Sequence, residues 1–130
     1  MKLIIRHDRF ATGGKYQILE KLTRTVAAIC RSDRSVRKLY IGIASGPEPK
    51  AGLKRRYDKF KQGHGINEMI LLYQSSSQAF CRDVEKYLED YFQANHPNII
   101  NRRAGGGGRV SQQPYHFVYL AVQRVGNSDA

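Results

Sequence analysis

The sequence has few cysteines, few acidic residues and no long apolar run, and each shortage excludes a class of protein. Two cysteines, Cys30 and Cys81, are too few to form a disulfide scaffold in a chain of 130 residues. The apolar run near the N-terminus is only three residues long before Arg6, so we expect neither a signal peptide nor a membrane span. These shortages favour a cytoplasmic protein that is not secreted.

Several enzyme motifs are also missing from the sequence. It contains no CxxC and no HExxH, the patterns that supply common zinc ligands. It contains no GxGxxG after a strand and no GxSxG, so nucleotide cofactors and serine hydrolysis find no support. We therefore look for function in the residues that the chain has in excess.

Basic residues are in excess, and they are unevenly distributed. Lysine and arginine number 22 against 11 acidic residues, which gives a net charge of +11 and a pI near 10.0. Residues 1–63 hold 16 basic and 5 acidic side chains, whereas residues 64–130 hold 6 of each. Clustered positive charge of this size indicates a nucleic-acid partner. An anionic membrane is the weaker rival as a partner.

Hydrophobic periodicity predicts strands and helices in alternation. We expect strands over 2–7, 38–45, 68–74 and 115–122, and helices over 16–31, 53–60 and 78–94. Gly46-Pro47-Glu48-Pro49 is expected to be a loop, and the serines at 75–77 offer helix N-caps. The order predicts an α/β (α+β) fold, a small mixed β-sheet flanked by helices. We expect a single domain over residues 1–125 and a frayed tail over 126–130.

The helix predicted over 53–60 separates two neighbouring arginines. Leu53, Tyr57 and Phe60 form one apolar stripe at helical spacing. Arg56 lies at the edge of this stripe and Arg55 faces away from it. Arg56 is therefore the guanidinium that packing would hold in place, although a side chain that merely snorkels over the core edge gives the same pattern.

The helix predicted over 78–94 places acidic residues beside an apolar stripe. Taking Val84 as the centre, Leu88 and Tyr91 fall on the stripe, Glu85 lies just outside it, and Glu89 lies further toward solvent. A carboxylate at such a boundary suits a metal ligand. A solvated acidic face that answers the basic half of the chain is the alternative.

Taken in order, Tyr40-Ile41-Gly42, Arg56, Glu85 and Asn101 resemble the GIY-YIG nuclease superfamily. The family has a strand ending in YIG, an arginine on the next helix, a glutamate on a later helix and an asparagine beyond it. The resemblance covers residues 39–101. It implies a GIY-YIG-like fold and a metal-dependent DNA endonuclease that hydrolyses phosphodiester bonds with Mg²⁺ or Mn²⁺.

The resemblance also implies roles for single residues. Tyr40 would lie near the attacked phosphate, Arg56 would hold that phosphate, Glu85 would be the only protein ligand of the metal, and Asn101 would shape the site. The first motif of the family, a GIY strand preceding YIG, is not evident, and we expect the strand at residues 2–7 to take its structural place. Without its tyrosine, the candidates for the general base are His7, Tyr57 and His64.

Further basic residues are candidates for DNA contacts. These are Arg34, Arg37, Lys38, Lys54, Arg55, Lys59, Arg102, Arg103 and Arg109. The last three flank the glycines at 105–108, a segment that reads either as a basic flap whose amides approach phosphates or as a plain linker. We expect DNA, duplex or branched, as the partner and no membrane; monomer and homodimer stay open. A non-catalytic nucleic-acid-binding module on the same fold, and an unrelated RNA-binding protein, are the other hypotheses.

Overall fold

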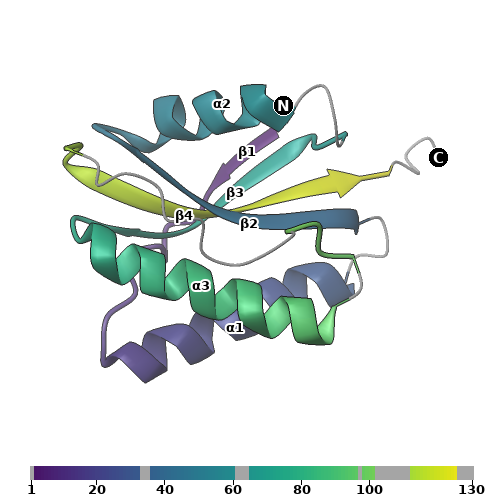
Figure 1. Cartoon of the computed structure of the whole chain (residues 1–130), viewed down its shortest axis with the longest axis horizontal. Helices are drawn as coiled ribbons and strands as arrows, with labels where there is room; N and C mark the ends of the chain where they lie inside the picture. The colour runs from purple at the N-terminus through teal and green to yellow at the C-terminus, as the bar shows by residue number, and fades with distance from the viewer. Residues whose placement is uncertain (1, 33–35, 61–64, 97, 102–111, 126–130) are drawn as a thin grey trace.

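The computed structural model describes residues 2–32, 36–60, 65–96, 98–101 and 112–125. These residues form four strands and three helices (Figure 1). In chain order the elements are β1 (Lys2–Ile5), α1 (Lys15–Ser32), β2 (Val36–Gly46), α2 (Pro49–Phe60), β3 (Glu68–Ser75), α3 (Gln78–Asn95) and β4 (Tyr115–Arg124). Every element expected from periodicity is present, and the predicted tail at 126–130 lies outside the described residues.

The four strands form one mixed sheet with the order β1-β3-β4-β2. β1 pairs with β3 in parallel, and β4 pairs antiparallel with both β3 and β2. The mixed α+β architecture is therefore as predicted. β2 and β1 are the two edge strands, at opposite sides of the sheet.

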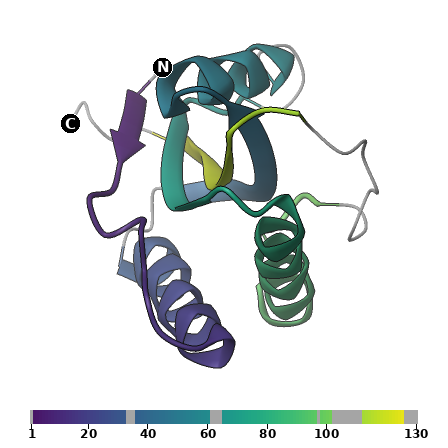
Figure 2. The same ribbon diagram turned by 90° about the vertical axis from the view of Figure 1, so that its left-hand side faces the viewer.

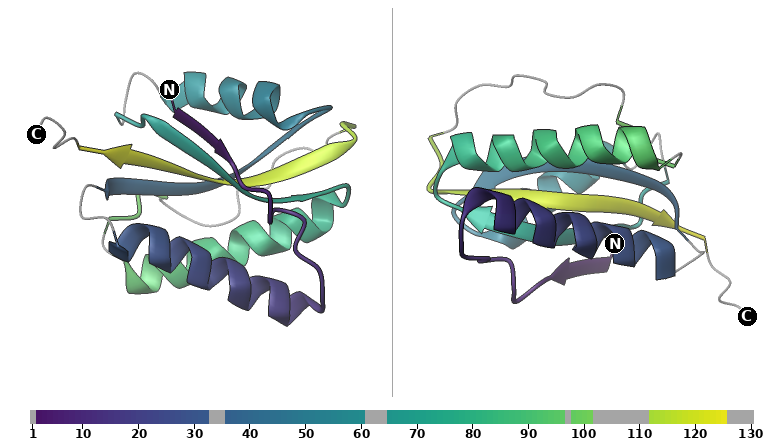
Figure 3. Two further views of the ribbon diagram at one scale, coloured as in Figure 1. Left: turned by 180° about the vertical axis from the view of Figure 1, so that it is seen from behind. Right: turned by 90° about the horizontal axis from the view of Figure 1, so that it is seen from below.

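Helices cover both faces of the sheet, as Figure 2 shows. α2 lies over one face, on a core that includes Leu53, Met69 and Phe117. α1 and α3 lie side by side on the other face and run in the same direction (Figure 3), over a larger core around Val26 and Leu88. This arrangement places α2 and α3 on opposite faces of the sheet, both beside the β2 edge.

The predicted loop at 46–49 is partly wrong, because α2 begins at Pro49 and β2 continues to Gly46. Proline is accepted in the first turn of a helix, where its missing N–H would have no helical partner. The Glu48 side chain accepts a hydrogen bond from the Ala51 N–H at 3.1 Å and so caps the helix. The N-cap predicted among the serines is Ser77, whose hydroxyl accepts from the Phe80 N–H.

The N-terminal strand, which we expect to take the place of the missing first motif, does not lie beside the strand that carries Tyr40-Ile41-Gly42. β1 pairs only with β3 at the far edge, and the neighbour of β2 is β4, where Tyr119 lies opposite Gly42. β4 has ten residues, is largely apolar and pairs with β2 along most of its length, whereas β1 has only four residues. The short β1 pairs with β3 at the far edge of the sheet.

No helix in the described part of the chain is long and apolar enough to cross a membrane.

Candidate functional site

α2 lays one row of its residues along β2. At the start of this row, Gly52 approaches the Ser45 carbonyl closely, with room for only a tight Cβ contact of 3.2 Å. Two turns later, Phe60 packs edge-to-face on Tyr40 with ring centroids 5.0 Å apart. Arg56 is one turn from each, since residues four apart share a helix face. It therefore lies above the stretch of β2 between Tyr40 and Ser45.

The burial of the two arginines agrees with the periodicity. Arg56 is half-buried, whereas Arg55 is exposed. The packing of Gly52 and Phe60 on β2 thus holds the backbone that carries Arg56, and Arg55 faces solvent.

α3 follows the same strand from the other face of the sheet. Its Cys81 thiol donates to the His116 carbonyl at 3.7 Å, beside Ser45, which pairs with His116. Two turns later, Glu89 reaches Asn101, which is bound to Ile41. Glu85 is midway between Cys81 and Glu89, so it lies below the same stretch of β2 that Arg56 overlies.

Asn101 closes part of the β2 edge. Its side-chain oxygen accepts from the Ile41 N–H at 2.9 Å, and its amide nitrogen donates to the Ile41 carbonyl at 2.8 Å and to Glu89 Oε2 at 2.6 Å. Gln93 on α3 donates to the Asn101 carbonyl at 2.9 Å. The Asn101 side chain therefore pairs with the Ile41 backbone as a strand residue would, and it connects α3 to β2.

Two tyrosines lie on the α2 face of the sheet at this position. The rings of Tyr40 and Tyr119 are stacked, with centroids 6.3 Å apart, and Tyr119 is only 2% exposed. A Cβ on Gly42 would overlap the Tyr119 ring, so the glycine of the Tyr40-Ile41-Gly42 motif is required by close approach rather than by its own backbone angle. Sequence reasoning missed Tyr119, because its place depends on the pairing of strands far apart in the chain.

The electrostatics couple these residues. Burial, and then the neighbouring Glu89 carboxylate, raise the pKa of Glu85 to about 7, against the opposing effect of Arg82 and Arg56. Burial also raises the pKa of Tyr40 and that of Tyr119, with Glu85 and Glu89 acting in the same direction. Both phenols are therefore protonated at neutral pH. Glu85, in contrast, changes charge close to neutrality.

The expected position of Glu89 is wrong. It is only 3% exposed and bonded to Asn101, whereas Glu85 is the half-buried, more accessible carboxylate. The buried arc of α3 is turned toward Phe92, and Tyr91 is 39% exposed. The reason is tertiary, because residues 98–101 fold back along β2 and cover the flank of the helix that Glu89 occupies.

A serine and a histidine form a second pair at the same sheet edge. Ser45 Oγ and His116 Nδ1 are 2.7 Å apart, and His116 is 3% exposed. Burial, and secondarily Arg82, lower the pKa of His116, so its ring is neutral near pH 7. Arg82 thus brings a second guanidinium to the α3 side of the site, one turn before Glu85.

The remaining predicted residues fall in three groups. Tyr57 packs at the edge of the core beneath α2, and His7 lies just after β1, across the sheet from β2. The basic residues predicted to contact DNA lie at the start of β2 and on α2, where they are exposed or half-buried: Arg37, Lys38, Lys54, Arg55 and Lys59. Outside the described residues are Arg34, His64, Arg102, Arg103 and Arg109 with the glycines at 105–108.

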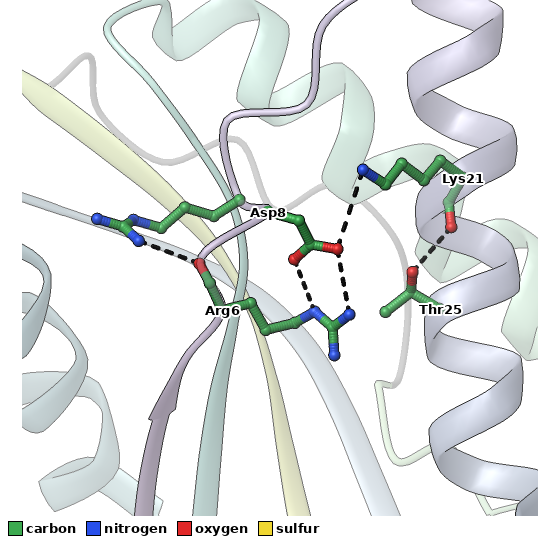
Figure 4. A network of polar contacts seen from close by, with 5 residues as sticks. Arg6, Asp8, Lys21 and Thr25 are labelled. Atoms are coloured by element: carbon green, nitrogen blue, oxygen red, sulfur yellow. Dashed lines mark hydrogen bonds and ion pairs between the residues drawn. The ribbon is translucent and has the colours of Figure 1, made fainter.

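A cavity of ≈ 580 Å³ lies at the opposite side of the molecule, between the segment after β1 and α1. Its cations already have partners. Arg6 makes a two-pronged contact with Asp8 at 3.0 and 3.2 Å, and Lys21 lies 3.9 Å from the same carboxylate (Figure 4). The hydrogen bond from Arg6 holds the pKa of Asp8 below its usual value. With its charges neutralised in this way, the cavity is a weaker candidate than the β2 edge.

The site offers a divalent metal one accessible carboxylate. Glu89 Oε2 is engaged by Asn101, and the described residues contain no group of three or more His, Cys, Asp or Glu side chains placed to hold a metal. Mg²⁺ keeps several waters and often uses only one or two protein carboxylates together with substrate phosphate. Glu85 fits that mode of binding.

A scan against protein-family models finds no match to this chain, and comparisons with curated proteins and with solved structures also find none.

Proposed function

We propose that this protein is a metal-dependent DNA endonuclease of the GIY-YIG type. The observation that carries the proposal is the convergence of Tyr40, Arg56, Glu85 and Asn101 on one sheet edge. They come from β2, α2, α3 and the segment after α3, and no two of them are neighbours in the sequence. A guanidinium on one side of the edge and an accessible carboxylate on the other are the two charges that phosphodiester hydrolysis needs.

Each side chain has a task in that reaction. The oxygen of a water molecule attacks phosphorus and the water gives up a proton, one P–O ester bond breaks, and the leaving oxygen takes up a proton, so that one water is consumed and one alcohol is released. Arg56 binds the phosphate and stabilises its growing negative charge. Glu85 would hold Mg²⁺ or Mn²⁺, which when bound supplies a Lewis acid for the phosphate and lowers the pKa of coordinated water. Tyr40, kept protonated by burial and supported by Tyr119, donates a hydrogen bond to the reacting oxygens.

A non-catalytic nucleic-acid-binding module is the second candidate. The basic side chains on α2 and at the start of β2 favour it, because exposed cations alone suffice to bind phosphates. Such a module has no use for a carboxylate whose pKa is raised at the centre of the basic edge. Cleavage separates the two candidates.

The test is incubation of pure protein with supercoiled plasmid DNA, in Mg²⁺ and in EDTA. We expect nicked or linear DNA with Mg²⁺ and none with EDTA. Glu85→Gln should abolish cleavage and keep DNA binding, whereas Asp90→Asn, an exposed acid on the same helix, should cut normally. Uncut plasmid with every divalent metal, or normal cutting by Glu85→Gln, would overturn the endonuclease and leave the binding module.

A further inference from the structure

β2 is an edge strand, so every second residue turns its backbone N–H and carbonyl away from the sheet. The register with β4 places Leu39, Ile41, Ile43 and Ser45 in this outward set. Leu39 is covered, because its N–H donates to the Asn98 carbonyl at 3.1 Å and its carbonyl accepts from the Ile100 N–H at 2.8 Å. Ile41 is covered by the Asn101 side chain.

Beyond Asn101, the described residues leave the rest of the outward set without a cover. Among the described residues, no partner is found for the outward N–H groups of Ile43 and Ser45. Within the described part of the chain, the cover reaches Ile41, where the Asn101 side chain takes the place of one more strand residue, and does not reach Ile43. A polar backbone donor at such a place needs water or a ligand.

The charges around the opening favour an anion. Arg56 on α2 lies above the stretch of β2 between Tyr40 and Ser45, which contains Ile43. Arg82 on α3 lies close enough to the Ser45–His116 pair to lower the pKa of His116. Backbone N–H groups that point outward can bind an anion, as they do in other anion-binding concavities of protein backbones, and a nearby guanidinium adds positive charge. Glu85 lies on the α3 face of the sheet, and the proposed function assigns it to a divalent metal ion. A bound phosphate would be a further ligand of that ion.

We propose that the open edge of β2 binds two successive phosphates of one nucleic-acid strand. The Ile43 N–H donates to the phosphate held by Arg56, and the Ser45 N–H donates to its neighbour, beside Arg82. Alternate strand residues are about 6.8 Å apart, which is comparable with the separation of neighbouring phosphates along a strand. The inference rests on the proposed function. It assigns to the β2 backbone the alignment of the sugar-phosphate backbone of the substrate. Since backbone donors read phosphates and not bases, this contact is independent of sequence.

Amide chemical shifts of isotopically labelled protein test the contact directly. A short DNA duplex is titrated in EDTA, so that no cleavage occurs. We expect the amide protons of Ile43 and Ser45 to move downfield, and those of Leu39 and Ile41, which already have partners, to move little. Shifts confined to α2, with Ile43 and Ser45 unchanged, would overturn the inference.

A proline variant removes one N–H from the edge. Proline is tolerated in an edge strand where the N–H faces away from the ladder, and the preceding Gly42 has no Cβ to clash with the ring. We expect Ile43→Pro to lower cleavage at least tenfold, as loss of a hydrogen bond to a charged group does. The matched control is Ile5→Pro, which removes an outward N–H from β1 at the far edge and should cut normally.

If Ile43→Pro fails to fold, an amide-to-ester replacement at position 43 removes the same N–H and keeps the strand. Normal cleavage by either variant would overturn the inference while leaving the endonuclease intact. Amide shifts without any cleavage by the wild type would overturn the endonuclease and keep the contact. Shifts of Ile43 and Ser45 that follow protein concentration in the absence of DNA would show that a strand of a second copy binds this edge instead.

Discussion

Glu85 carries an energetic cost as a buried acid, and its sign can be worked out. Its pKa is about 7 in the folded chain against an ordinary value of 4.5, because burial disfavours the charged form. The folded state therefore binds the proton more tightly, and the free energy of unfolding falls as pH rises from 4.5 to 7. At about 1.4 kcal/mol per unit, the full shift is on the order of 3 kcal/mol, reduced by the partial exposure of the side chain.

Glu85→Gln should therefore stabilise the protein while it abolishes cleavage. We expect the free energy of unfolding in urea to rise by about 1–2 kcal/mol at pH 8, and the gain to vanish near pH 4.5. Asp90→Asn, which removes an exposed acid, should show no such pH-dependent gain. Equal stability of Glu85→Gln and wild type at pH 8 would contradict the buried, charged state of Glu85.

Arg56 and Arg55 separate binding from turnover. If Arg56 stabilises the charge that develops on the phosphate, Arg56→Ala should lower the single-turnover cleavage rate about a hundredfold. Arg55→Ala removes an exposed cation and should weaken DNA affinity with little change in the rate at saturating protein. Equal losses of rate in the two variants would show that the packing of Arg56 over β2 has no catalytic meaning.

At the scale of elements, the contact between α3 and β2 depends on a buried polar network. Asn101→Ala would leave Ile41 and Glu89 without their partner, and each unsatisfied buried group costs about 1–3 kcal/mol. We expect this variant to lose about 3 kcal/mol of unfolding free energy. Glu89→Gln keeps an acceptor oxygen and should lose only about 1 kcal/mol. Urea unfolding measures both.

The critical result is that Asn101→Ala loses more unfolding free energy than Glu89→Gln. This order is expected because the Asn101 side chain bonds both α3 and β2. Gln93→Ala provides a milder control, since it removes one hydrogen bond to the Asn101 carbonyl and leaves the buried network in place. Wild-type stability of Asn101→Ala would mean that the Asn101 side chain does not hold α3 to β2.

At the scale of the whole molecule, the net charge of +11 should govern DNA affinity. About 0.9 counterions are released per phosphate neutralised on duplex DNA, so several contacts predict a log–log slope against salt steeper than about −3. Replacing Lys54, Arg55 and Lys59 together with glutamine should reduce the slope by about 2.7. Fluorescence anisotropy over a range of salt concentrations measures it. A flat dependence would contradict nucleic-acid binding, and Lys21→Gln, at the far side of the molecule, should leave the slope unchanged.

Local sequence patterns determined the elements and the packing of α2. Helical spacing identified the faces of the helices and distinguished half-buried Arg56 from exposed Arg55. Short apolar runs located all four strands, and the run in β2 also shows alternation. These patterns are local, because a residue's face within a helix or strand depends only on its near neighbours in the chain.

Tertiary structure alone decided which strand lies beside β2 and which acid is buried. The pattern of apolar residues along a strand does not say which other strand it pairs with, so it did not identify β4 as the neighbour of Gly42 or place Tyr119 beside Tyr40. Glu89 is buried because residues 98–101 return to β2, and a helical wheel contains no information on what covers a flank. Strand order and burial depend on contacts between residues far apart in the chain, and those contacts assemble the β2 edge.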